Sequence, residues 1–262
     1  MAATPIRALC VALLAALALA VAPVSGVRAS MQPHRHSGGT TDAVVRQEKS
    51  HPAASVMGVF AALAALGLVV AVVQVDDAVL MHEADSIMSL GGSWEDYRRW
   101  AELRVDALNH ALKGIPEERI RYHICWGSWH GPHAYDPPLK DVIDMVVRVN
   151  AGHYAMEQAN ARHEHEWQIW EDVKLPEGRK LIPGVVTHHT NVVEHPELVA
   201  QRLTRLAKVV GRENVLGGTD CGFAQGAFVR RVHPEIQWAK LAALSEGCEL
   251  ATRQLWGAKA AA

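Results

Sequence analysis

Two patterns of apolar residues alternate along the chain from Val72 to Trp256. Short β-branched runs predict buried strands, and longer segments with apolar residues three and four apart predict helices. The predicted strands are residues 69–77, 119–125, 152–158, 181–188 and 214–221. The predicted helices are residues 93–114, 137–150, 196–211 and 234–256, and Ser93, Pro196, Gly114 and Gly211 mark some of their ends.

Strands that alternate with helices predict an α/β fold, in which helices cover a parallel sheet. No predicted strand is followed by the glycine-rich fingerprint of a dinucleotide-binding fold. A (β/α)8 TIM-barrel type is therefore the better match, although five β/α units cannot close a barrel. We predict a barrel truncated to about five units, preceded by an apolar N-terminal leader.

The N-terminal part of the chain carries two uncharged apolar runs. Residues 1–30 have the outline of a signal peptide, and a polar, linker-like segment follows them. The second run, Ala53–Val75, is long enough to cross a bilayer, but its end reads as a buried strand. We expect residues 1–52 to be a signal-like leader and linker, disordered or the product of a wrong start, and residues 53–262 to form the partial barrel. A membrane-spanning or exported protein is the alternative.

Composition supports a folded domain and narrows its function. Apolar residues make up 49% of the chain and charged residues 21%, so most of it should bury a core. The net charge of −2, without a basic stripe, gives no electrostatic footprint for nucleic acid. Four cysteines are too few and too widely spaced for a disulfide scaffold, whereas fifteen histidines keep metal chemistry open.

Polar and metal-binding residue types gather where the predicted strands end. They are Asp76, Asp77, His123, Cys125, Glu157, His188, His189, Asp220 and Cys221. The carboxyl ends of barrel strands open onto one face, and residues two apart on a strand point to the same side. His123, Cys125, Glu157 and Cys221 can therefore converge, and their nitrogen, sulfur and oxygen donors suit tetrahedral Zn²⁺.

Each of these residues also has a purely structural interpretation. A strand cysteine is most often a small buried apolar residue, a lone buried histidine is usually hydrogen-bonded, and a strand-end carboxylate often caps a helix. We expect Cys248, in the last predicted helix, to belong to the core. We expect the segment RHEHEW, Arg162–Trp167, to be a solvated loop or helix start, with a metal role as the alternative.

Several motifs together resemble the C-terminal catalytic barrel of the cobalamin-independent methionine synthase family (methionine synthase II-like). They are HIC at 123–125, the glutamate that ends the next strand, TDCG at 219–222, VVQVDDAVL and IPGVVTHHTNVVEHP. The resemblance implies that His123, Cys125, Glu157 and Cys221 bind zinc. It further implies that Asp76 binds the amino group of homocysteine and that His189 is the proton donor.

The activity implied by the resemblance is methyl transfer from 5-methyltetrahydrofolate to the zinc-bound thiolate of homocysteine, which gives methionine. The loop CWGSWHGPH is bulkier than that of the family, and Thr187 replaces a family aspartate. Alkylation of another thiol such as coenzyme M is therefore an alternative, and a non-catalytic zinc-binding half-barrel is a second one. We expect small-molecule partners, no nucleic acid or membrane, a cytoplasmic location, and self-association through the open barrel edges.

Overall fold

The computed structural model describes residues 72–127, 133, 135–223 and 231–257. The chain divides into Met1–Ser50 and His51–Ala262, and every described residue belongs to the second unit. The expected leader and linker at residues 1–52, and the apolar run as far as residue 71, lie outside the described residues. The end of that run is described, and Val73–Asp77 is a strand as predicted.

The strands form one five-stranded sheet in which neighbours are parallel. The strands are β1 (Val73–Asp77), β2 (Ile120–Ile124), β3 (His153–Met156), β4 (Lys180–Val186) and β5 (Gly218–Thr219). Their order in the sheet equals their order in the sequence. That order is typical of successive units of a (β/α)8 barrel, whereas a doubly wound sheet reverses direction at a switch point. Within the part of the chain that the structure describes, the predicted α/β class and the five predicted strands are confirmed.

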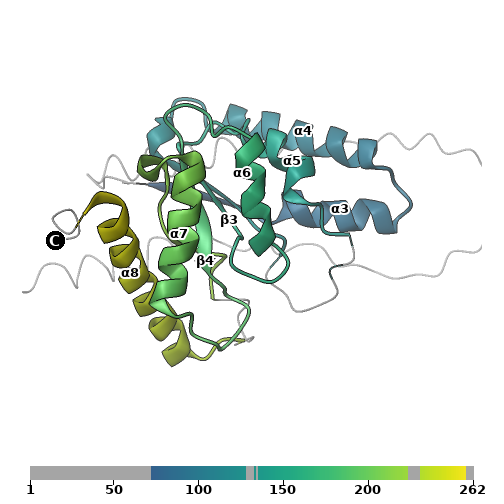
Figure 1. The fold of residues 1–262 in the computed structure, drawn as a ribbon. Helices are drawn as coiled ribbons and strands as arrows, with labels where there is room; N and C mark the ends of the chain where they lie inside the picture. Colours follow the sequence, from purple (N-terminus) through teal and green to yellow (C-terminus); the bar gives the residue numbers. More distant parts are fainter. Residues whose placement is uncertain (1–71, 128–132, 134, 224–230, 258–262) are drawn as a thin grey trace, which may run out of the picture. The chain divides into compact units, whose positions relative to one another are not determined.

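Each strand is followed along the chain by at least one helix (Figure 1). They are α3 (Val79–Ser89), α4 (Trp94–Ala111), α5 (Leu139–Val146), α6 (Ile169–Asp172), α7 (Pro196–Val210) and α8 (Pro234–Trp256), with 3-10 turns at Glu117–Arg119, Glu164–Gln168 and Arg212–Asn214. Figure 1 shows α7 beside α8, and α3 near α4. The helix α3 was not predicted from the sequence: Ala78 at its N-cap makes no side-chain hydrogen bond, and the Leu80 backbone N–H donates instead, at 2.9 Å, to Oδ1 of Asp77, the last residue of β1.

Capping residues explain where the predicted helices begin. The Ser93 side chain accepts a hydrogen bond from the Asp96 backbone N–H, and the Asp96 side chain accepts one from the Ser93 backbone N–H, which forms a capping box at the start of α4. Pro196 begins α7, whose last residue is followed by Gly211. The helix α4 ends at Ala111, three residues earlier than Gly114 would suggest.

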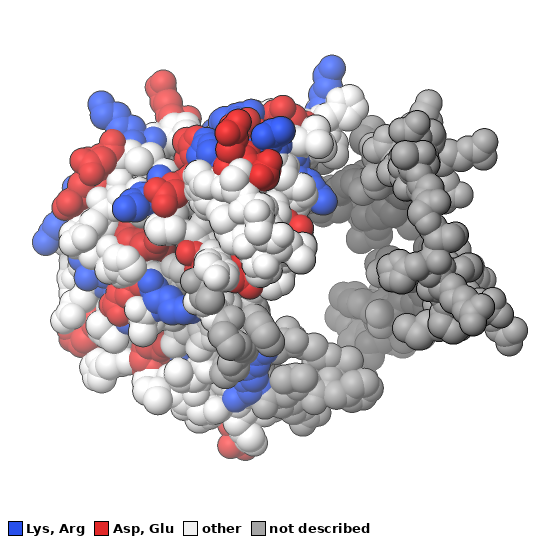
Figure 2. Space-filling model, turned by 90° about the vertical axis from the view of Figure 1, so that its right-hand side faces the viewer, with Lys and Arg blue, Asp and Glu red and all other residues white. Residues whose placement is uncertain are grey.

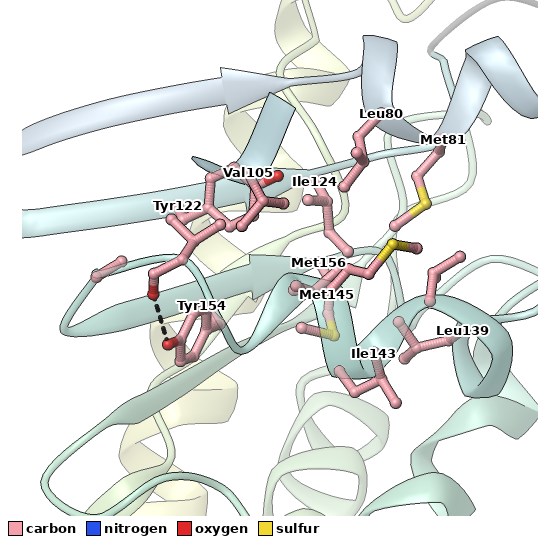
Figure 3. Close-up of a cluster of buried hydrophobic side chains, with 14 of the residues drawn as sticks. Leu80, Met81, Val105, Tyr122, Ile124, Leu139, Ile143, Met145, Tyr154 and Met156 are labelled. Atoms are coloured by element: carbon pink, nitrogen blue, oxygen red, sulfur yellow. Dashed lines mark hydrogen bonds between the residues drawn. The ribbon is translucent and has the colours of Figure 1, made fainter. Parts of the chain in front are cut away.

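The two faces of the sheet differ, and this difference positions the site. Tyr122, Ile124, Tyr154 and Met156 alternate along β2 and β3 and pack with residues of the helices in the main core (Figure 3). The residues between them point to the opposite face, because side chains alternate along a strand. His123 therefore points to the face away from this core.

No helix among the described residues is long and apolar enough to span a bilayer. On the face of the protein shown in Figure 2, the described lysine and arginine side chains are interspersed with aspartate and glutamate.

Candidate metal centre

Three of the four predicted zinc ligands lie together at the carboxyl ends of the strands. His123 belongs to β2, Cys125 follows that strand directly, and Cys221 comes two residues after β5. Their ligand atoms all lie within 4.8 Å of one another, and the two cysteine Sγ atoms are 3.9 Å apart. The structure thus brings together residues that are 96 positions apart in the sequence.

The approach of Cys221 to Cys125 depends on Asp220 and Gly184. The backbone N–H of Asp220 donates to the Val186 carbonyl at 2.9 Å, and Asp220 Oδ1 accepts from the backbone of Gln158 and Ala159 at 2.9 and 2.8 Å. A Cβ atom at Gly184 would lie 2.7 Å from Asp220 Cα, so only glycine permits this contact. Burial, together with the nearby Glu157, raises the pKa of the Asp220 carboxyl to about 7.

The fourth predicted ligand, Glu157, belongs to a second group beside the first. Its side chain is fully buried, and its ligand atom groups with those of His188 and His189 within 4.8 Å. Glu157 Oε1 accepts a hydrogen bond from the Trp126 backbone at 3.1 Å, and Oε2 accepts one from Asn160 Nδ2 at 2.7 Å. The carboxylate is therefore fixed against the residue that follows Cys125.

The charges around Glu157 keep it ionised. Burial by itself would raise its pKa, but the interactions with His189, His188, His163 and Arg162 lower the pKa below its usual value. His189 Nε2 lies 3.8 Å from Glu157 Oε2 and 3.3 Å from an Arg162 guanidinium nitrogen. Burial, with a contribution from His189, lowers the pKa of His188 to about 4, so His188 is neutral near pH 7.

A cavity of about 530 Å³ opens beside the three clustered residues. Its lining includes Asp76, His123, Cys125 and Cys221. Asp76 pairs with His123 in the β1–β2 register, and its carboxylate accepts a hydrogen bond from Gln74 Nε2 at 2.7 Å. The structure therefore places the predicted substrate-binding carboxylate and the three clustered ligand candidates around one space.

The donor set and its geometry fit a zinc ion. A Zn–S bond of about 2.3 Å and a tetrahedral angle place two sulfur atoms about 3.8 Å apart, close to the 3.9 Å observed between Cys125 and Cys221. His123 Nε2 is buried without a hydrogen-bond partner among the described residues. The hydrogen bond with Cys221, followed by burial, raises the pKa of the Cys125 thiol, and a bound cation would favour the thiolate instead.

The segment RHEHEW differs in part from its prediction. A short helix does begin at Glu164, but His163 and Glu166 are buried rather than solvated. His163 Nδ1 and Glu166 Oε2 share a hydrogen bond of 2.8 Å, the His163 ring stacks on Trp126, and Glu166 Oε1 accepts from the Leu139 backbone. The spacing of His163 and Glu166 by three residues, one helical turn, was the available signal for this pairing.

Sequence reasoning also missed Asn160 and Arg162 as neighbours of the site. Both follow Glu157 closely in the sequence, and both place a nitrogen atom near its carboxylate. A polar cluster directly after a strand-end glutamate is the signal that could have indicated them. Cys248, by contrast, is a partly buried residue of α8 that packs against the smaller apolar cluster, as predicted.

Comparison with known proteins identifies the family. The model of the family described as "Cobalamin-independent synthase, Catalytic domain" matches residues 38–243. The chain belongs to this family. The fold is also that of a B12-independent methionine synthase from Shewanella sp. W3-18-1, solved in complex with selenomethionine, with a TM-score of 0.51 and 21% identity over 75% of this chain and 52% of that one.

Two curated relatives illustrate the range of the family. A 2-hydroxypropyl-CoM lyase of Xanthobacter autotrophicus is 26% identical over 63% of this chain and 48% of the relative. A methionine synthase of Thermococcus kodakarensis is 22% identical over 70% of this chain and 44% of the relative. The chain thus spans about half the length of the curated relatives that it matches.

Proposed function

We propose that this protein is a zinc-dependent thiol alkyltransferase. The observation that carries the proposal is the meeting of His123, Cys125 and Cys221 at the edge of a cavity. Family membership supports the same class, because the relatives include proteins named methionine synthase and 2-hydroxypropyl-CoM lyase. The specific reaction that we propose is methyl transfer from 5-methyltetrahydrofolate to homocysteine, which gives methionine.

In this proposal His123, Cys125, Cys221 and Glu157 are the zinc ligands. Two thiolates and a carboxylate give the bound ion an excess of negative charge, so that it activates water poorly. When bound, zinc lowers the pKa of an incoming thiol and presents it as a nucleophilic thiolate. Asn160 and the Trp126 backbone hold the Glu157 carboxylate in place by their hydrogen bonds.

The remaining roles follow from position and charge. Asp76 is a carboxylate at the wall of the cavity, where we propose that it binds the ammonium group of the amino-acid substrate. His189 is the proposed proton donor to the leaving nitrogen of the methyl carrier, which is general-acid work suited to a histidine. His189 Nε2 lies 3.8 Å from Glu157 Oε2, which places the proposed proton donor beside a proposed zinc ligand.

A second candidate reaction is alkyl transfer to or from coenzyme M. The relative named 2-hydroxypropyl-CoM lyase favours it, because that protein shares 26% identity with this chain. A non-catalytic zinc-binding half-barrel is the remaining alternative. All three hypotheses place the same residues around zinc, and they differ in the molecule that enters the cavity.

A methyl-transfer assay on the full chain tests the proposal. We expect methionine to form from homocysteine and 5-methyltetrahydrofolate, and Cys221→Ser to abolish the reaction. Cys248→Ser is the matched control, because Cys248 is a cysteine of α8 that does not line this cavity, and it should retain activity. Turnover with coenzyme M substrates alone would select the second candidate. Zinc binding without turnover of either thiol would select the half-barrel.

We further propose a cytoplasmic location and self-association. Cysteines used as thiols suit a reducing compartment. Among the described residues β1 and β5 are the outer strands of the sheet, and outer strands favour pairing with another copy. Cell fractionation and light scattering of the purified protein test the two proposals separately. Recovery from an extracytoplasmic fraction would contradict the first, and a monomer at all concentrations would contradict the second.

A further inference from the structure

His188 is a buried polar side chain with unmet hydrogen-bonding capacity. Its exposed fraction is 0%, and neither Nδ1 nor Nε2 has a hydrogen-bond partner among the described residues. Buried polar side chains in folded proteins almost always have a partner. An orphaned imidazole of this kind beside a candidate metal centre therefore points to a ligand that completes it.

The register of the sheet places His188 next to the candidate centre. Val186 of β4 pairs with Thr219 of β5 in parallel. His188 and Cys221 each come two residues later in the sequence, so the loops that carry them leave two neighbouring strands at the same edge of the sheet. One nitrogen of His188 also lies within 4.8 Å of a Glu157 carboxylate oxygen.

The surroundings of His188 offer two kinds of contact. The rings of His188 and His189 lie 4.0 Å apart and are tilted by 41°, which is a packing contact and satisfies neither nitrogen of His188. The oxygens of Glu157 already accept hydrogen bonds from Trp126 and Asn160. A cation held between the two groups would use the free nitrogen of His188 as a donor.

We propose that His188 is an additional zinc ligand in this chain, bound in the absence of substrate and replaced by the sulfur of the incoming thiol. The inference rests on the proposed function and deepens it. Zinc accepts a fifth donor in catalytic sites, so His188 can join the other four ligand candidates. In the exchange the zinc–nitrogen bond breaks, a zinc–sulfur bond forms, and the thiol proton passes to solvent, so no oxidant or reductant takes part.

The test compares His188→Asn with His153→Asn in the full chain. His153 is a suitable control, because it is a partly buried histidine at the opposite end of β3, and its Nδ1 also lacks a partner. Zinc affinity is measured by competition with a chelator, and the ligands are counted by X-ray absorption at the zinc edge. We expect His188→Asn to weaken zinc binding by about tenfold or more and to remove one nitrogen neighbour. His153→Asn should leave both unchanged.

The possible outcomes separate this inference from the proposed function. If His188→Asn binds zinc with the wild-type affinity and zinc keeps the same number of nitrogen neighbours, the inference about His188 is wrong, whereas the proposed function still stands. His188 would then be only a packing partner of His189. A wild-type protein that binds no zinc would overturn the proposed function and the inference with it. His188→Gln, which keeps more of the side-chain volume, replaces His188→Asn if circular dichroism shows that the first variant does not fold. Addition of homocysteine to the wild type should exchange one nitrogen neighbour for one sulfur.

Discussion

The loop between β4 and α7, which carries His188 and His189, is held by a buried ion pair. Lys240 of α8 is fully buried, and its Nζ atom lies 2.8 Å from Glu194 Oε2. The other oxygen of Glu194 accepts a hydrogen bond of 2.9 Å from the backbone N–H of Thr187, next to the two histidines. Lys240 Nζ also donates to the Val192 carbonyl of the same loop.

Replacing Lys240 by methionine should destabilise the protein strongly. Methionine keeps most of the side-chain volume, so the change removes the charge and leaves the Glu194 carboxylate buried without its cation. Loss of one partner from a buried pair costs about 3–5 kcal/mol. In the double variant Lys240→Met, Glu194→Gln the uncompensated charge is gone, and the glutamine oxygen can still accept from Thr187. We therefore expect the double variant to recover about 1–3 kcal/mol of the loss.

The assay is urea unfolding at pH 7, monitored both by tryptophan fluorescence and by circular dichroism. Coincident transitions establish that a single free energy of unfolding describes each variant. Glu194→Gln alone completes the double-mutant cycle. If the losses in the two single variants simply add in the double variant, Lys240 and Glu194 are not coupled, and the account of this loop is wrong.

Three further predictions concern the strands, a helix cap and the metal. Gly184→Ala should destabilise the protein by about 1–3 kcal/mol in urea unfolding and reduce zinc binding, because the new Cβ would clash with the Asp220 backbone and displace Cys221. Gly222→Ala is the control: a Cβ there contacts nothing within 4 Å, so this variant should lose much less stability. Ser93→Ala should cost about 1 kcal/mol in thermal unfolding at neutral pH. Hydrogen bonds with Ser93 lower the pKa of the Asp96 carboxyl below its ordinary value of 3.8, so the part of the capping contribution that involves this carboxylate is present above that pH and is lost as the pH falls through the lowered pKa. The hydrogen bond from the Asp96 N–H to Ser93 Oγ does not titrate, so Ser93→Ala should cost less in acid than at neutral pH, and an equal cost would contradict this assignment. Removal of zinc by a chelator should lower the melting temperature of the wild type more than that of Cys221→Ser, since a ligand present at about 100 times its Kd stabilises by about 2.7 kcal/mol and the variant binds zinc less tightly.

Much of the fold was predictable because local signals agree with the tertiary structure. The β-branched runs mark the strands, and Ser93, Pro196 and Gly211 mark helix ends with residues whose backbone preferences are strong. The helix α3 escaped prediction because Asp77, whose side chain accepts from the Leu80 backbone at the start of the helix, was interpreted only as the end of a strand. The buried pairing of His163 with Glu166 was mistaken for a solvated segment, because charge alone does not reveal that two polar groups satisfy each other.

Only those residues of the candidate site that lie at the carboxyl ends of the strands could be predicted from the sequence. The positions of His123, Cys125 and Cys221 followed from the alternation of side chains and from the parallel sheet. The grouping of Glu157 with the two histidines, and the tie between Lys240 and the loop that carries them, depend on contacts between distant segments. Side-chain rotamers and loop conformations determine these contacts, and local sequence patterns do not predict them.

The most direct test of the central claim is X-ray absorption at the zinc edge on the wild-type protein, without and with homocysteine. We predict about one zinc per chain, with two sulfur neighbours before the thiol is added and three afterwards. Cys221→Ser should lose the metal or one of these sulfur neighbours. A metal-replete preparation that binds no zinc, or zinc without sulfur neighbours, would contradict the claim that His123, Cys125 and Cys221 hold the ion that receives the substrate.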